Sequence, residues 1–342
     1  MRLIDEVHEN RLLGRWARLL PRPPAQVGGV HESDAELLPL GDRRLLALTV
    51  DTVDEEVRTG LYREPATAGR IAAIAALSDL AAVGADPLGL LLAVGLPGRE
   101  AEDVQRGVAA GVAEVCRLAG VGVLGGDTNA AASLSVACTG VGVVPEGEAL
   151  MRVGLHAGDL LFATGPFGLG SALAAARWIG LPPALFAEHD YRPPVRLREG
   201  RALRGLATAC IDTSDGLVAA LDQLARLNAV AVEVGGPLER LLDPKVEAVR
   251  RHLALPAFPF LAGQHGEFEL VFGIAPPRLP DLLRVSKATG WQPVRLGSAV
   301  KGAGLRFAGR VVDGARVRNL FAELGGDVAA YVCALCTRHA EV

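Results

Sequence analysis

The chain has 342 residues, of which 50% are hydrophobic and only 4% aromatic, and its formal net charge is −4. A single hydrophobic core stops growing near about 250–300 residues, so this length favours two domains. The 35 Lys and Arg against 39 Asp and Glu leave no broad basic surface, which argues against a nucleic-acid partner.

The N-terminal residues 1–20 mix Arg, Asp, Glu and His with Leu and Ile. This pattern predicts an amphipathic helix and lacks the apolar block of a signal peptide. The longest apolar run, residues 88–97, is far shorter than the roughly 20 residues that a membrane span needs. We therefore expect a cytoplasmic protein with no membrane partner.

Apolar runs and helical patterns alternate through the first half of the chain. Strands are predicted at residues 45–50, 88–96, 121–124 and 133–144, and helices at 65–83 and 102–119. The helix at 65–83 begins at Pro65 and ends before Gly84, which places Asp79 on its last turn.

The pattern restarts after Arg152, so we predict a boundary near residue 150 and domains 1–150 and 151–342. Strands are expected at 160–164 and 209–211, and helices at 171–178, 196–208 and 217–227. The glycine-rich stretch 165–170 lacks the Lys of a P-loop, and we interpret it as a tight strand-to-helix connection. The alternation predicts an α/β (α+β) fold.

Acidic residues recur where predicted strands or helices end. Carboxylates brought together repel one another, and burial adds to the cost unless cations lie between them. Mg²⁺ is the natural cation, because it prefers carboxylate oxygens and binds substrate phosphates. The sequence therefore predicts a magnesium–nucleotide site built from Asp34, Asp51, Asp79, Asp127, Asp212 and Asp215.

Two motifs carry most of this prediction. The segment Asp212-Thr213-Ser214-Asp215-Gly216 joins a strand to a helix; a helix N-cap would explain one polar side chain, but not two carboxylates and a hydroxyl. The segment 125–128, Gly-Gly-Asp-Thr, follows a predicted strand, and paired glycines let a backbone approach a phosphate closely. A plain β-turn remains the alternative for the second motif.

Taken in order, segments 77–87, 125–128, 149–154, 192–194 and 211–216 resemble the thiamine-monophosphate kinase family, whose superfamily includes aminoimidazole ribonucleotide synthetase. The likeness covers roughly residues 25–275. It implies a two-domain aminoimidazole ribonucleotide synthetase-like fold and a homodimer whose N-terminal domains pair through their sheets. It also implies ATP in the cleft between the domains, several Mg²⁺ ions, and a first domain that carries metal, ATP and dimer contacts.

The resemblance also implies roles for individual positions. Phosphoryl transfer would be in line, supported by Asp212 and Asp215, with no covalent nucleophile. The ATP contacts would be Gly126, Asp127, Arg152 and Ser214. The metal ligands would be Asp34, Thr49, Asp51, Asp79, Asp127, Asp212 and Asp215.

Departures from the family pattern concentrate on the acceptor side. Arg58 stands where the family has a histidine that contacts thiamine phosphate, and Gly266 aligns with a substrate-contacting glutamate. These substitutions remove a carboxylate and add a fixed cation beside a substrate with a cationic ring. We therefore predict weak or absent activity on thiamine monophosphate, and preference for an acceptor with a carboxylate or a second phosphate.

Three functions remain open at this point. The leading one is an ATP- and Mg²⁺-dependent kinase that acts on a small metabolite. The second is an ATP-dependent ligase or cyclase of the same superfamily, in which ATP activates an amide or formyl oxygen. The third is a nucleotide-binding regulator without catalysis.

Overall fold

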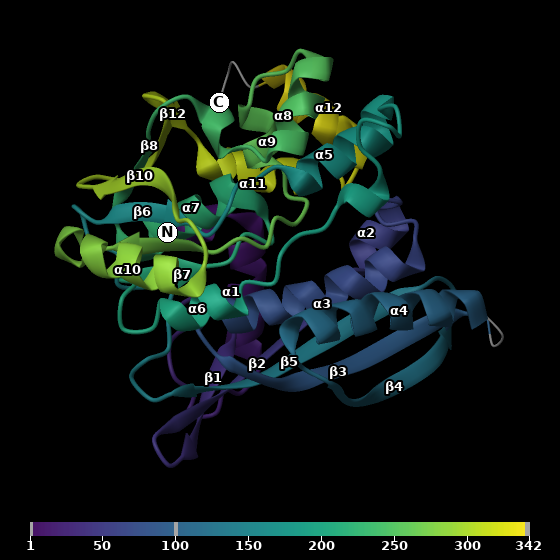
Figure 1. The fold of residues 1–342 in the computed structure, drawn as a ribbon, viewed down its shortest axis with the longest axis horizontal. Coiled ribbons are helices and arrows are strands. Elements are labelled where there is room, and N and C mark those ends of the chain that lie inside the picture. The colour runs from purple at the N-terminus through teal and green to yellow at the C-terminus, as the bar shows by residue number, and fades with distance from the viewer. Residues whose placement is uncertain (1–2, 99–101, 339–342) are drawn as a thin grey trace.

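The computed structural model describes residues 3–98 and 102–338, and these form two β-sheets with helices packed against them (Figure 1). The first sheet has the strand order β1-β2-β5-β3-β4, and the second has the order β12-β11-β8-β10-β6-β9-β7. The prediction of a mixed α/β fold is confirmed. In the first half the elements are η1 (Leu3–Glu6), α1 (His8–Leu19), β1 (Glu36–Gly41), β2 (Arg44–Thr52), α2 (Asp54–Thr59), α3 (Pro65–Ala82), β3 (Asp86–Pro97), α4 (Glu102–Ala119), β4 (Val123–Ala131) and β5 (Ser135–Pro145).

The predicted boundary near residue 150 lies between β5 and the first strand of the second sheet, β6, and it remains a prediction. The second half continues with β6 (Leu160–Ala163), α5 (Leu169–Ala175), η2 (Ala176–Gly180), η3 (Glu188–Asp190), α6 (Leu197–Ala202), β7 (Ala209–Ile211), α7 (Gly216–Asn228), β8 (Ala231–Val234), η4 (Leu238–Leu241), α8 (Pro244–Leu253), α9 (Phe258–Ala262), β9 (Val271–Ile274), η5 (Pro276–Arg278), α10 (Leu279–Thr289), β10 (Val294–Val300), β11 (Gly304–Phe307), β12 (Arg310–Val312), α11 (Gly314–Glu323) and α12 (Val328–Arg338).

Helix α3 lies between the first sheet and the second half of the chain (Figure 1). It begins at Pro65, is built mostly of Ala, Ile and Leu, and is buried along most of its length. Gly200 of α6 packs so closely that a Cβ there would lie 2.1 Å from the carbonyl oxygen of Ala81. The end of α3, where Asp79 lies, is therefore held between the two halves.

The two faces of the first sheet differ. On β2, Leu45 and Ala47 are buried against the helices, whereas Val50 points the other way and its side chain is 68% exposed. Leu91 on β3 is also exposed on this second face. We call the face that α3 and α4 cover the helix face, and the other the open face.

The structure contains elements that the sequence did not predict, among them α2 and those from β8 to α12, and it departs from the predictions in further segments. Strand β1 was not predicted, and the helix expected at 196–208 is shorter, at Leu197–Ala202. The Gly125-Gly126-Asp127-Thr128 segment lies inside strand β4 and not in a turn after it. A Cβ on Gly126 would lie 2.0 Å from the carbonyl oxygen of Leu92 on β3, so close strand packing requires this glycine.

Helix α1 belongs to the first half by sequence but contacts the second half. The Asn10 side chain donates to Gln223 Oε1 on α7 at 3.0 Å, and Arg226 of α7 pairs with Glu6 at 2.6 Å. Residues 20–35 then connect α1 to β1. No helix within residues 3–98 and 102–338 is long and apolar enough to cross a membrane.

Candidate metal and nucleotide site

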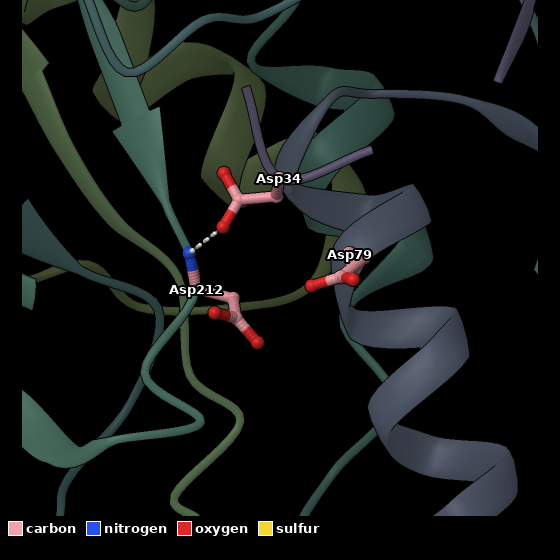
Figure 2. A group of neighbouring side chains, drawn as sticks. All are labelled: Asp34, Asp79 and Asp212. Atoms are coloured by element: carbon pink, nitrogen blue, oxygen red, sulfur yellow. Dashed lines mark hydrogen bonds between the residues drawn. The ribbon is translucent and has the colours of Figure 1, made fainter. Parts of the chain in front are cut away.

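Three aspartates from separate parts of the chain meet between the two halves. Asp34 precedes β1, Asp79 lies on the last turn of α3, and Asp212 follows β7. One carboxylate oxygen from each lies within 4.8 Å of the other two, and Figure 2 shows the three side chains around one space. Asp79 falls on the last turn, as the sequence predicted.

Hydrogen bonds fix two of these carboxylates. Arg152 donates to Asp34 Oδ1 at 2.8 Å, and the backbone N–H of Asp212 reaches the same oxygen at 3.3 Å, the contact drawn in Figure 2. Ser78 donates to Asp212 Oδ2 at 2.8 Å. The Asp34 side chain is completely buried, and Arg152 is the cation that pairs with it.

Thr49 and Asp51 extend the cluster from strand β2. They lie two residues apart, so their side chains share the helix face, and Thr49 donates a hydrogen bond to Asp79. Asp34 Oδ2 and Asp51 Oδ2 are buried and have no hydrogen-bond partner among the described residues. Unpaired buried carboxylate oxygens are costly, so these atoms point to a cation as their partner.

Ser214 and Asp215 complete the cluster in the β7–α7 loop. Ser214 donates to Asp212 Oδ1 at 3.1 Å. Asp215 occupies the position before α7, but in the described structure its side chain accepts no capping hydrogen bond from that helix. The helix-cap explanation for this acid therefore does not hold.

The aspartates lie where ionisation is unfavourable without a cation. Burial, together with the charge of Asp34, raises the pKa of Asp212 to about 7. Burial raises the pKa of Asp51 to about 6, with Asp215 and Asp34 adding to the effect. The pKa of Asp79 is raised well above its usual value by burial and by Asp51. The donor set of carboxylates and a hydroxyl fits Mg²⁺, which would restore the ionised forms.

A cavity of about 990 Å³ opens onto these side chains. Its lining includes Asp34, Thr49, Asp51, Asp79, Arg152, Asp212, Ser214 and Asp215, so eight predicted site residues share one space. This volume is at the upper end of the range for small-molecule sites, about 300–1,000 Å³. It suits a nucleotide together with a second small substrate.

Asp127 lies apart from this cavity, on the edge strand β4. Strand pairing aligns Asp127 with Ala93, and Ala93 with Ala137. Ala137 in turn pairs with Thr52, so all four side chains share the open face of the sheet. Asp51 precedes Thr52 and therefore points to the opposite face. Within one protomer, Asp127 and its neighbour Gly126 do not join the other predicted ligands.

Comparison with known proteins shows the family to which this chain belongs. Residues 32–144 match the family AIR synthase related protein, N-terminal domain. A thiamine-monophosphate kinase from Caulobacter vibrioides is 33% identical over 257 residues, which cover 70% of each chain. The chain belongs to the thiamine-monophosphate kinase family. It is accordingly an ATP-dependent phosphotransferase.

Solved structures share the fold of this family member. The protein tt0281 from Thermus thermophilus superposes with a TM-score of 0.77 at 30% identity, over 89% of this chain and 98% of that one. The solved structure of AaThiL complexed with AMPPCP and TMP gives a TM-score of 0.74 at 21% identity, over 92% and 97% of the two chains. At that identity the second comparison shows the fold alone.

The two predicted acceptor residues lie outside the cavity that the aspartates line. Arg58 is on α2, and its side chain is 70% exposed, 3.9 Å from Glu55. Gly266 is buried with a φ of +79°, and a Cβ there would lie 2.7 Å from the Tyr191 hydroxyl. A glutamate side chain has no room at this position, because the Tyr191 hydroxyl and the Phe268 ring fill the space.

Sequence reasoning missed one wall of the cavity. Helix α1 contributes Asn10, and the second half contributes Gln223 and Arg318. The Arg318 side chain is only 5% exposed and donates to Gln223 Oε1 at 2.6 Å. The amphipathic pattern of residues 1–20 predicted the helix, but no signal in the sequence indicated what its buried face would contact.

Proposed function

We propose that this chain is a cytoplasmic, Mg²⁺-dependent kinase that transfers the γ-phosphoryl group of ATP to a small acceptor, as thiamine-monophosphate kinases do. The observation that carries the proposal is the convergence of Asp34, Asp79 and Asp212 within 4.8 Å. These carboxylates are buried with too few protein cations to neutralise them. Bound metal ions would supply the missing positive charge. The names of relatives at 33% and 31% identity support the same chemistry.

The proposed ligand set is the one that lines the cavity. Asp34, Thr49, Asp51, Asp79, Asp212 and Asp215 would hold magnesium, which when bound offsets the charge of the phosphates. Arg152, oriented by its bond to Asp34, and Ser214 would contact ATP.

Transfer needs no covalent enzyme intermediate. An acceptor oxygen forms the new bond to the γ-phosphorus while the bond from that phosphorus to the β–γ bridging oxygen breaks, which releases ADP. The chain contributes position and charge: Arg152, which is partly buried and paired with Asp34, supplies a cation that lines the cavity.

We further propose that Gly126 and Asp127 act on the site of a partner subunit in a homodimer. Asp127 faces the open side of its own sheet, opposite to Asp51, and its carboxylate is exposed. The open face also exposes Val50 and Leu91, apolar side chains of the kind that interfaces cover. Pairing of two open faces would bring Asp127 toward the other protomer.

We propose the acceptor from the names of the relatives and from the carboxylate that this chain lacks at Gly266. Thiamine monophosphate is the first candidate, since relatives are named for it. The position of Gly266 has no carboxylate and no space for one, which supports our expectation that thiamine monophosphate is a poor substrate. The expectation also rested on the charge of Arg58. Because the Arg58 side chain is exposed, it does not support that expectation within one protomer.

Product analysis tests the proposed reaction. The protein is incubated with ATP, Mg²⁺ and a panel of small metabolites that includes thiamine monophosphate, and the nucleotide and acceptor products are identified. A phosphorylated acceptor plus ADP supports the kinase. ADP plus free phosphate and a dehydrated product would establish the ligase or cyclase instead. Tight ATP binding without ADP release for any acceptor would establish the regulator.

Mixed dimers test the contribution of Asp127 across subunits. Asp127→Asn and Asp212→Asn are each expected to be inactive alone, and co-expression should restore about a quarter of wild-type activity, since half of the dimers are mixed and each has one intact site. The matched control pairs Asp51→Asn with Asp212→Asn. Both of those residues line the same cavity, so no mixed dimer has an intact site. Equal results for the two pairs would show that Asp127 does not act in the partner.

A further inference from the structure

A second cavity of about 520 Å³ lies in the C-terminal half, away from the aspartates. Strands β8, β10 and β11, the glycines that follow β8, and Arg240 of η4 form its walls. It shares no lining residue with the cavity of the metal site among those that the structure describes. Its volume falls within the range of about 300–1,000 Å³ that is usual for small-molecule sites.

Arginine dominates the charge of this cavity. Arg240, Arg295 and Arg306 line it, and Glu233 is the carboxylate among its lining residues. The Arg306–Glu233 pair is 3.5 Å apart, with both side chains about half exposed. An exposed pair of this kind contributes little, about 0–1 kcal/mol, so a stronger anion would readily displace it.

The guanidinium of Arg240 is held in place by backbone oxygens. It donates to the carbonyls of Arg295 at 2.6 Å and Gly235 at 2.7 Å. These neutral acceptors leave its positive charge uncompensated. The guanidinium of Arg295 has no hydrogen bond or ion pair with any residue in the described part of the chain. The cavity therefore has a net charge of about +2, concentrated on side chains that are not neutralised.

Glycines shape the floor of the cavity. Gly297 lies at the irregularity where β10 changes its pairing with β6, and a Cβ there would lie 1.8 Å from the carbonyl oxygen of Glu233. Gly236 has a φ of +75°, and a Cβ would lie 3.0 Å from Arg240 Nε. Side chains at these positions would push against the strand or the arginine. Both glycines thus keep the arginines close to an open space.

We propose that this cavity is a binding site for a small organic phosphate, separate from the ATP and acceptor sites. A phosphate monoester carries about −1.5 to −2 charges near neutral pH, which matches the excess of arginine. Guanidinium groups bind phosphate oxygens in a two-pronged geometry, so Arg295 and Arg306 are the residues that grip the phosphate.

Binding of inorganic phosphate and of ribose 5-phosphate to the full-length protein, measured by calorimetry, tests this inference. The structure predicts that ribose 5-phosphate binds more tightly than phosphate, because the cavity is much larger than one phosphate. Arg295→Glu should weaken both by about tenfold or more, since it replaces a charged donor by a repelling carboxylate. Arg310→Glu is the matched control, an exposed arginine of β12 outside the cavity, and should change binding less than about twofold.

Arg152→Ala distinguishes this site from the catalytic cavity. Loss of ribose 5-phosphate binding in Arg152→Ala but not in Arg295→Glu would assign the ligand to the ATP or acceptor site and overturn the proposal. Equal weakening by Arg295→Glu and Arg310→Glu would reduce it to nonspecific charge attraction, and the absence of binding to the wild type would also overturn it. Failure of the kinase assay would leave these results unaffected, because none of them depends on turnover.

Discussion

Buried carboxylates gather in two regions of this molecule, and the regions differ in the protein groups that pair with those carboxylates. Around Asp34 and Asp51, one carboxylate oxygen of each residue has no partner in the described structure, and Arg152 is the cation paired with Asp34. Around Glu267 and Glu269 in the second half, the chain itself supplies partners for the acids. Burial alone therefore does not distinguish a ligand site from a structural one, whereas the supply of donors does.

In the second region, groups of the protein donate hydrogen bonds to the acids. Glu267 accepts backbone N–H groups from Gly168, Leu169 and Gly170 at 2.7, 3.0 and 3.2 Å. Glu269 is paired with Arg196 at 2.7 Å. The N-terminus of the helix that follows the glycine-rich stretch 165–170 is thus occupied by a carboxylate of the protein. This agrees with our interpretation of that stretch as a connection and leaves those donors unavailable to a phosphate.

The largest expected effect is loss of activity on removing one charge from the first region. Asp212→Asn should lower kcat at least about a thousandfold, because loss of about 4 kcal/mol of transition-state stabilisation equals three tenfold steps. Steady-state turnover at saturating Mg²⁺ measures this. Asp281→Asn, which alters an exposed ion pair, is the control and should stay near wild-type activity. Substantial turnover by Asp212→Asn would refute the metal-ligand assignment.

The same kind of change in the second region should affect stability. Glu267→Ala leaves buried N–H groups without an acceptor, so we expect the free energy of unfolding to fall by about 3 kcal/mol. Denaturant unfolding measures the loss, and Glu267→Gln, which keeps one acceptor oxygen, should lose less. If Glu267→Ala were as stable as the wild type, the contrast between the regions would fail.

Magnesium should stabilise the protein only through the first region. At about 100 times its dissociation constant, a ligand that binds only the folded state adds about 2.7 kcal/mol. Thermal unfolding with and without Mg²⁺ should show this increase in the wild type and a much smaller one in Asp79→Asn. Without metal, Asp79→Asn should be at least as stable as the wild type, because it relieves repulsion among buried acids. Equal stabilisation of both proteins by Mg²⁺ would place the ion elsewhere.

The pH dependence of stability sharpens the contrast further. Burial raises the pKa of Glu267 to about 8, although its backbone donors oppose the shift. Between about pH 5 and 8 the folded state then holds a proton that the unfolded state has lost, so stability falls as pH rises, by up to about 1.4 kcal/mol per pH unit. Unfolding of the wild type and Glu267→Gln across this range measures it. The slope should be shallower in the variant, and equal slopes would contradict the assignment to Glu267.

The success of the sequence predictions also differs between parts of the molecule. The aspartates were recognisable because acids at element ends of an apolar chain need a reason, and Asp34, Asp79 and Asp212 do converge. The position of Asp127 was not predictable, since the face to which a side chain points depends on strand register, which only pairing fixes.

The acceptor side was harder to predict for a similar reason. Gly266 could be aligned with a glutamate, but the space there is filled by Phe268 together with Tyr191, and Tyr191 lies far from Gly266 in sequence. Arg318 lines the catalytic cavity from the C-terminal segment, where no motif marks it. Contacts between distant segments depend on packing, and neither composition nor spacing encodes them locally.

The smallest expected effect concerns Arg58, which lies outside both regions. Its side chain is 70% exposed and outside the aspartate cavity, so within one protomer its charge is screened by solvent. Arg58→His should therefore change the KM for any acceptor by less than about twofold, if the partner subunit brings no acceptor to it. Steady-state kinetics with the best acceptor and with thiamine monophosphate measure this, with Arg63→His as the control from the same segment. A larger change confined to KM for the acceptor would show that Arg58 contacts the acceptor in the dimer, and would restore the charge argument that the sequence suggested.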